Sequence, residues 1–454
     1  MQRGVIIVLI LLLPSCSTIS LGDLFQDYAS QLKPVRQAIN DNDLTRATQQ
    51  LPHNSQFHSN YLLNQLERAR IAYLSKQSAV SQHGFEDVYR AVENKRQSAK
   101  IQLSAGLEQS NALLTNDAVI SYLPAAYEMT MLHSYKALSY IFDNNLEAAL
   151  VEVRRANKVQ VDELTANQAD IDKQVQRAAE NFPSMTTLIG DIKHGFQNAF
   201  TFYLSAILYE ANKQFDDAYI DYKKALEINA NNPYLQQTVL QLAKQQGFEQ
   251  DYNQFTKRFA EAPSIDNQQG QVVVIIEQGL VPSKAEFTLR LPIYTSQGDA
   301  RFYSLALPIY NDVAFEAAHT HIQLNDHRLA LIPLVKLESL AAKTLETQSP
   351  SRIARQLLRL AAKEKMRAEL ARTGGDVGNI LANLYNLASE QADTRSWLTL
   401  PNQIAVARTA LSSGQHRLTL PGHQTIDFTV SKQRLTFVFL TSINHYFDHH
   451  VVQL

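Results

Sequence analysis

The spacing of apolar residues changes once along the chain, near position 262. Before that point, apolar residues recur every three or four positions and Gly and Pro are few, which predicts amphipathic helices. After it, short runs rich in Val, Ile, Leu and Phe are separated by turn-forming residues, which predicts strands. We therefore expect an α+β multidomain protein, with an α-helical domain over 16–262 and a β-rich domain over 270–454.

The clearest helical stretch, Ala199 to Gly247, predicts two short amphipathic helices around a polar turn and the start of a third. It resembles a tetratricopeptide (TPR) unit, whose repeat is about 34 residues. His133 to Gln160 repeats the pattern at an offset of 69 residues, close to two such periods. A TPR-like solenoid is the preferred interpretation, and an irregular helical bundle is the alternative. The matched positions are Ala137, Tyr140, Ala149, Val153 and Ala156, against Ala206, Tyr209, Ala218, Tyr222 and Ala225.

The second half of the chain predicts an Ig-like or related β-sandwich. Apolar and polar residues alternate in Phe287-Leu289-Leu291 and in Leu435-Phe437-Phe439, which indicates strands with one face against a second sheet. A helical pair, Ser351 to Arg372 and Asp376 to Gln391, interrupts it as an insertion at about 340–392. The predicted strands cover 271–279, 285–294, 301–310, 330–337, 416–420, 425–430 and 434–443.

The N-terminus predicts a lipoprotein signal peptide over 1–15. A positive start is followed by ten apolar residues, Gly4 to Leu13, which are too few to span a bilayer. The sequence Leu-Pro-Ser before Cys16 resembles a bacterial lipobox, although Pro is unusual at its middle position. An ordinary signal peptide that happens to contain a Cys is the alternative. Lipidation of Cys16 implies a membrane anchor, and Ser17 rather than Asp implies the outer membrane, facing the periplasm.

Composition narrows the function classes further. Hydrophobic residues make up 45% of the chain, enough for packed cores, so the chain is not disordered. The formal net charge of −2 gives no reason to expect nucleic acid as a partner. Cys16 is the only cysteine, so the chain forms no internal disulfide, and once Cys16 is lipidated no free thiol remains.

Three further blocks of sequence carry a resemblance at the level of a whole protein. They lie at 127–142 with 152–160, at 270–284 and at 392–416. Through them the chain resembles an uncharacterised family of proteobacterial lipoproteins with TPR-like N-terminal regions. The resemblance implies a lipidated envelope protein and brings no established catalytic residues.

Motifs for common enzyme chemistry are missing from the sequence. Neither GxGxxG nor GxxxxGK is present, and the chain has no GxSxG and no HExxH. An SxxK at Ser30 to Lys33 is not accompanied by SDN or KTG. We therefore predict a protein that is not an enzyme and that needs no cofactor.

The favoured function is a lipid-anchored cell-envelope scaffold whose helical groove binds another envelope protein, in cell-wall or outer-membrane assembly. Polar residues of the best helical block would line the concave face, where TPR proteins bind peptides. Internal ion pairs between adjacent helices would explain the same residues. Trp397, the only Trp, is predicted to anchor the core. The candidate partner-binding residues are Glu128, His133, Arg154, Arg155, Tyr209 and Tyr222.

Two alternative functions rest on other residues. His319 and His321 would share a strand face, and Asp326 with His327 could complete a metal site. The basic helix 351–372, with Arg355, Arg359 and Lys363, could instead bind peptidoglycan, another polysaccharide or phospholipid headgroups, or be a solvated face. A weaker metal candidate near the C-terminus comprises His445, Asp448, His449 and His450.

Overall fold

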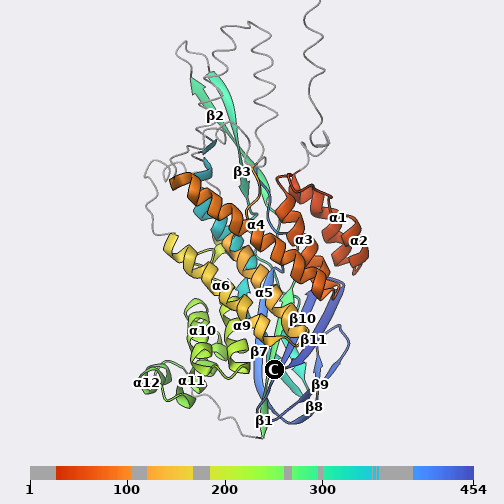
Figure 1. The fold of residues 1–454 in the computed structure, drawn as a ribbon, viewed down its shortest axis with the longest axis vertical. Coiled ribbons are helices and arrows are strands. Elements are labelled where there is room, and N and C mark those ends of the chain that lie inside the picture. Colours follow the sequence, from red (N-terminus) through yellow and green to blue (C-terminus); the bar gives the residue numbers. More distant parts are fainter. Residues whose placement is uncertain are drawn as a thin grey trace, which may run out of the picture.

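A computed structural model describes residues 27–104, 120–166, 185–259, 268–294, 300–349, 351–353, 355–356 and 392–454. Helices cover one face of a five-stranded sheet, and a four-stranded sheet packs on its other face (Figure 1). The chain is therefore an α+β protein, as the hydrophobic pattern predicts. None of the helices within the described ranges is long and apolar enough to cross a membrane.

Most of the helices follow one another as antiparallel pairs. In each pair the two helices pack together, and the second packs against the first helix of the next described pair. The helices are α1 (Tyr28–Asn40), α2 (Leu44–Gln49), α3 (Tyr61–Leu74), α4 (Ser78–Ser104), α5 (Ala126–Phe142), α6 (Leu146–Ala166), α8 (Thr186–Ile189), α9 (Ala199–Ala211), α10 (Phe215–Ile228), α11 (Pro233–Gln245) and α12 (Glu249–Thr256).

The same turn joins the two helices of five pairs. In the α5–α6 turn, the Asn144 amide donates to the Ile141 carbonyl at 3.0 Å and the Asn145 amide to the Tyr140 carbonyl at 2.8 Å. These two bonds define a Schellman motif, which needs one residue with positive φ. The positive-φ residues stand at 42, 76, 144, 213 and 247, so the intervals are 34, 68, 69 and 34 residues. The 69-residue offset thus belongs to a longer series.

The five-stranded sheet is the central layer of the molecule. β1 (Gln269–Gln278) lies between β10 (Leu435–Ile443), to which it is parallel, and the antiparallel β7 (Gln403–Ser412). The edge strands are β11 (Tyr446–Gln453) beside β10 and β6 (Ile332–Lys336) beside β7. Because β1 is buried on both faces, it reads as a nearly continuous apolar run rather than an alternating one.

The second sheet has the strand order β5-β4-β8-β9 and packs against one face of the first. Val272, Val274 and Ile276 of β1 point towards it, whereas Val273 and Ile275 join the core shared with the helices. The two sheets thus pack face to face, as in a sandwich, with helices as a third layer. The strands are β4 (His321–Leu324), β5 (His327–Ala330), β8 (Gly414–Thr419) and β9 (Ile426–Val430).

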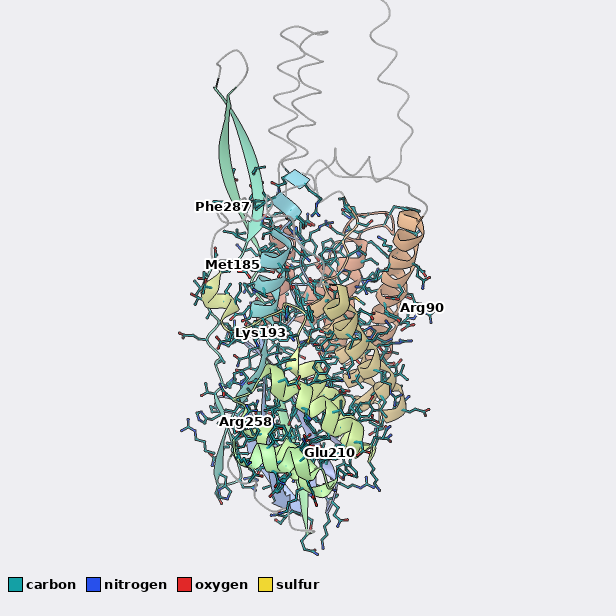
Figure 2. The ribbon with its side chains drawn as sticks, turned by 90° about the vertical axis from the view of Figure 1, so that its left-hand side faces the viewer. Arg90, Met185, Lys193, Glu210, Arg258 and Phe287 are labelled. Atoms are coloured by element: carbon teal, nitrogen blue, oxygen red, sulfur yellow. The ribbon has the colours of Figure 1, made fainter. Side chains whose placement is uncertain are left out.

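A separate hairpin extends away from these sheets. β2 (Ala285–Tyr294) pairs with β3 (Ala300–Ile309) as a two-stranded ribbon (Figures 1 and 2). The predicted bounds of both strands agree with the structure to within one residue. The alternating positions of β2 therefore belong to this ribbon and not to either of the two packed sheets.

Two features of the β-rich half differ from the prediction. Leu435, Phe437 and Phe439 face the helices, and the intervening Val438 faces the second sheet, because β10 is buried on both sides. β5 and β11 were not predicted as strands. Residues 337–349 are helical and pack into the core shared with the helices, but most of the predicted insertion lies outside the described residues.

Candidate functional site

The first helix of each described pair lies next to the β-rich half, and polar side chains of two of them, α3 and α5, bind the irregular segment 392–402. On α3, the Glu67 carboxylate accepts the Leu398 amide at 2.7 Å and the Thr399 amide at 3.1 Å. On α5, Glu128 accepts the Trp397 amide at 2.8 Å. All these side chains are buried. The inner helices therefore hold a stretch of the chain's own backbone, as a groove would hold a peptide.

A buried ion pair joins α3 to the central sheet. The Arg70 guanidinium donates to the Glu277 carboxylate of β1, and both side chains are fully inaccessible to solvent. Tyr135 and Thr441 also donate to Glu277, at 2.9 and 2.8 Å. The guanidinium lies 4.1 Å from the centroid of the Tyr135 ring. Although burial opposes it, Glu277 raises the pKa of Arg70 above its ordinary value, so Arg70 stays charged.

A second polar cluster lies between α4, α5 and α6. His133 is 2.7 Å from Glu152, which also pairs with Lys136 at 2.9 Å and with Arg155 at 3.0 Å. Lys136 also pairs with Glu86 at 2.5 Å. Of the candidate partner-binding residues, His133 therefore contacts Glu152 between α5 and α6, with a pKa that burial lowers, and Arg155 forms internal ion pairs with Glu152 of its own helix and, at 3.3 Å, with Glu86 of α4.

The two candidate tyrosines are also bonded within the chain. The Tyr222 hydroxyl donates to Glu210 at 2.6 Å and accepts from Arg408 of β7 at 2.8 Å. Glu210, labelled in Figure 2, pairs with Arg408 at 2.6 Å. Arg154 donates to the Tyr209 hydroxyl at 3.2 Å and is itself exposed. Of the six candidates, Glu128, His133, Tyr209 and Tyr222 are buried, Arg155 is half-buried and Arg154 is exposed.

The candidate metal residues have other neighbours. His319 lies 3.1 Å from the Ser442 hydroxyl, and its ring packs against His423. His321 faces Arg328 at 3.1 Å, and Asp326 is exposed in the β4–β5 turn. In the part of the chain that the structure describes, no three His, Cys, Asp or Glu side chains are grouped so as to hold a metal ion.

Of the C-terminal candidate residues, Asp448, His449 and His450 lie on β11, and His445 lies in the turn before it. His450 stacks on Phe142 of α5 with ring centroids 3.8 Å apart. Asp448 pairs with Lys76 at 2.7 Å and lies 3.5 Å from His450. These contacts join the edge of the sheet to the helices.

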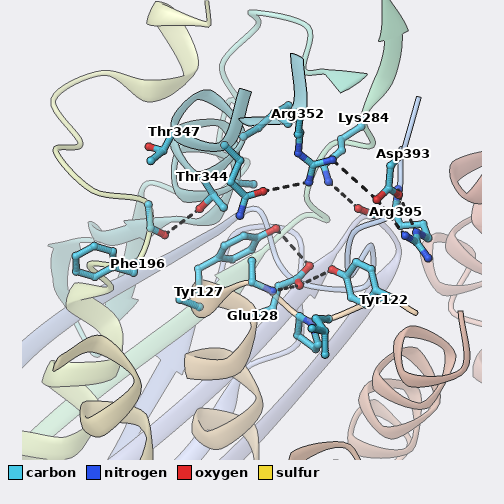
Figure 3. Close-up of a pocket in the computed structure, with 18 of the residues that line it drawn as sticks. Tyr122, Tyr127, Glu128, Phe196, Lys284, Thr344, Thr347, Arg352, Asp393 and Arg395 are labelled. Carbon is cyan, nitrogen blue, oxygen red and sulfur yellow. Dashed lines mark hydrogen bonds and ion pairs between the residues drawn. The ribbon is translucent and has the colours of Figure 1, made fainter. Parts of the chain in front are cut away.

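A pocket of about 540 Å³ lies between the helices and the β-rich half (Figure 3). Its walls come from the segment before α5, the loop around 194–196, the helix 337–349, the loop after β1 and the start of segment 392–402. A pocket of this size suits a small-molecule ligand or a peptide end. Its charged lining residues are Glu128, Glu163, Lys284, Arg352, Arg355, Asp393 and Arg395, with His194 beside them.

The cations of this pocket are arranged around the carboxylate of Asp393. Arg395 binds it through Nε at 2.7 Å and through a second nitrogen at 3.1 Å, and Arg352 lies 3.9 Å away. Although burial opposes it, Arg395 holds the pKa of Asp393 well below its usual range. Burial and the Arg352 cation lower the pKa of Lys284 to about 8. The pocket therefore suits a negatively charged group.

Sequence reasoning did not single out Lys284, Asp393 or Arg395. Lys284 and Arg395 are 111 residues apart and meet only because β1 and segment 392–402 converge. The sequence did contain a signal for these residues, because each stands close to a strongly apolar stretch. Lys284 follows β1, and Asp393 and Arg395 precede Trp397. Of the predicted basic helix, Arg352 and Arg355 line the pocket. Arg359 and Lys363, like Cys16, lie outside the described residues.

A scan against models of protein families finds none that matches this chain. A search of curated protein sequences finds no significant match either.

Proposed function

We propose that this protein is a lipid-anchored scaffold of the bacterial cell envelope, with a TPR-like helical array that binds another envelope protein. The repeated Schellman turn carries the proposal, because its intervals of 34, 68, 69 and 34 residues match the TPR period. An irregular bundle would not need one turn geometry at one period. The positions 110 and 178, where the same interval falls between the observed turns, lie outside the described residues.

The chain itself occupies the inner side of this array. Glu67, Arg70 and Glu128 bind segment 392–402 and the central sheet, so these side chains are already used. The second helix of each pair lies on the outer side and remains available to bind a partner. On α6, Val151, Arg154, Lys158 and Val161 recur at the three-to-four spacing of one helix face, and all four are exposed. Lys158 pairs with Asp162 at 2.5 Å, so Arg154 between two exposed valines is the cation that this face offers to a partner surface that is both apolar and acidic.

The lipid anchor gives the scaffold its location. Cys16 with its preceding signal peptide over 1–15 would tether the protein to the outer membrane, facing the periplasm, and more than one acyl chain gives stable anchoring. Confinement to one membrane raises the effective concentration of the scaffold near a partner in the same compartment. Assembly of the cell wall or of the outer membrane fits such a role.

Affinity capture tests the proposal. Residues 17–454 serve as bait in an envelope extract, with Arg154→Glu as the test variant and Lys244→Glu, an exposed charge reversal on α11, as the matched control. We expect one protein to be enriched by the wild type and by Lys244→Glu, and lost with Arg154→Glu. No enrichment over an unrelated lipoprotein, or equal capture by Arg154→Glu, would contradict the proposal.

A further inference from the structure

Cations outnumber the carboxylates that neutralise them at one wall of the pocket. Lys284, Arg352 and Arg395 surround Asp393, but Arg395 takes both of its oxygens. Glu128 is occupied by the Tyr122 hydroxyl and by the Ala125 and Trp397 amides, at 2.8 Å for each amide. Two carboxylates, Asp393 and Glu128, therefore face three cations, and of these cations only Arg395 binds a carboxylate closely, which leaves Lys284 and Arg352 with weaker compensation.

The bonds of Lys284 and Arg352 leave donors available. Lys284 donates to a carbonyl oxygen, that of Arg395, at 2.6 Å. Arg352 donates to Gln348 at 3.0 Å and lies at the outer limit of an ion pair with Asp393, 3.9 Å. Among the described residues, the buried Arg352 Nε has no hydrogen-bond partner. A buried donor without a partner is unfavourable, and it marks a place where a ligand oxygen would be stabilised.

The surroundings hold these cations in place before any ligand arrives. Asp393 and Arg395 begin the segment that Glu67 and Glu128 bind through backbone amides. Arg352 follows the helix 337–349, where Thr344 donates to the Gly195 carbonyl at 3.4 Å (Figure 3). A site whose donors are already positioned loses little conformational entropy on binding.

We propose that this pocket binds an oxyanion, a carboxylate or a phosphate carried by a small ligand, between Lys284 Nζ and the Arg352 guanidinium. A planar guanidinium and an ammonium both bind such oxygens through charge-assisted hydrogen bonds. Asp393 acts as a positioning residue, because it orients Arg395 and faces Arg352. This site lies apart from the outer face of α6, and its binding can be measured with no protein partner present.

Titration calorimetry on residues 17–454 tests the site. The probes are inorganic phosphate, acetyl-alanyl-alanine with its free carboxylate, and the C-terminal amide of the same dipeptide. We expect phosphate, the free dipeptide or both to bind, the amide to bind at least about tenfold more weakly than the free dipeptide, and affinity to fall as salt rises. Lys284→Gln and Arg352→Gln should each weaken binding about tenfold or more. Lys336→Gln, an exposed charge removal on β6, should change nothing.

Thermal melting of each variant keeps the result interpretable. Lys284→Arg retains the charge and should bind within a few-fold of the wild type, so it reports on the site if Lys284→Gln does not fold. Absence of binding of both phosphate and the free dipeptide up to about 10 mM would overturn the proposal. So would binding that Lys284→Gln and Arg352→Gln leave unchanged.

Discussion

Glu67 shows how a single buried carboxyl can connect the helices to the rest of the chain. It accepts two backbone amides and the Thr399 hydroxyl, the last at 2.5 Å. Burial is the largest influence on it and raises its pKa to about 7, although these hydrogen bonds act in the opposite direction. At neutral pH this contact is therefore close to its titration point.

Stability should depend on pH through Glu67. The folded pKa of about 7 lies above the ordinary value of 4.5, so between these values the folded protein binds more protons than the unfolded chain. The favourable contribution is complete below pH 4.5 and is lost as pH rises through 7. We expect the free energy of unfolding to fall by about 3 kcal/mol as the pH rises through this range. Urea denaturation of the wild type at several pH values across this range should show this fall. A Glu67→Gln variant with the same slope would contradict it.

The Arg70–Glu277 pair makes a second prediction at this scale. Arg70→Met leaves a carboxylate buried without its cation, so the free energy of unfolding should fall by about 3–5 kcal/mol. The double variant Arg70→Met/Glu277→Gln should lose less than the single one, because no buried charge is left unpaired. Arg417 and Asp427 form an exposed pair at 3.1 Å, and Arg417→Met should change stability by less than about 1 kcal/mol. Equal losses in Arg70→Met and Arg417→Met would contradict this account.

At the scale of elements, the repeated turn is the feature that sequence spacing indicated only in part. The Ala and Tyr pattern gave the 69-residue offset, but the positive-φ positions are Asn, Lys and Gly, with no common side chain to reveal them. Strands were predictable where an apolar run was long, as in β1. β11 was missed because Asp448, His449 and His450 stand together at its centre and break the alternation of apolar and polar positions. The pocket was not predictable, because its residues meet only through tertiary packing.

The turn at Lys213 gives a prediction at this scale. A side chain at φ 60° is strained by about 1–2 kcal/mol, while Gly adopts this conformation freely. Because Gly also loses more entropy on folding, Lys213→Gly should raise the free energy of unfolding by about 0.5–1 kcal/mol. Lys158→Gly, inside α6, should lower it by about 1 kcal/mol. Calorimetric melting curves measure both, and a loss of stability in Lys213→Gly would contradict the turn assignment.

At the scale of the whole molecule, the helices and the sheet share one core. Val273 and Ile275 of β1 pack in the same cluster as the helices, and ion pairs such as Arg408–Glu210 cross between the two halves. The predicted boundary near residue 262 stays a prediction. The shared core and the polar contacts with segment 392–402 explain why the inner face of the array is not available to a partner.

Anchoring makes a prediction for the whole protein in the cell. Cys16→Ser removes the proposed acylation site, so the protein should move from the membrane fraction to the soluble periplasmic fraction. Ser17→Ala, which leaves the cysteine in place, should stay with the membrane. Fractionation followed by intact-mass analysis measures both the location and the acyl chains. Retention of Cys16→Ser in the membrane fraction without added lipid mass would contradict lipid anchoring.

The central claim is that the outer face of α6 binds another envelope protein, and site-specific photocrosslinking in living cells tests it most directly. A photoreactive residue replaces Arg154 in one strain and Lys244, exposed on α11, in another. We expect a discrete adduct with a second protein from position 154 and none from position 244. No adduct from either position, or the same set of adducts from both, would contradict the claim.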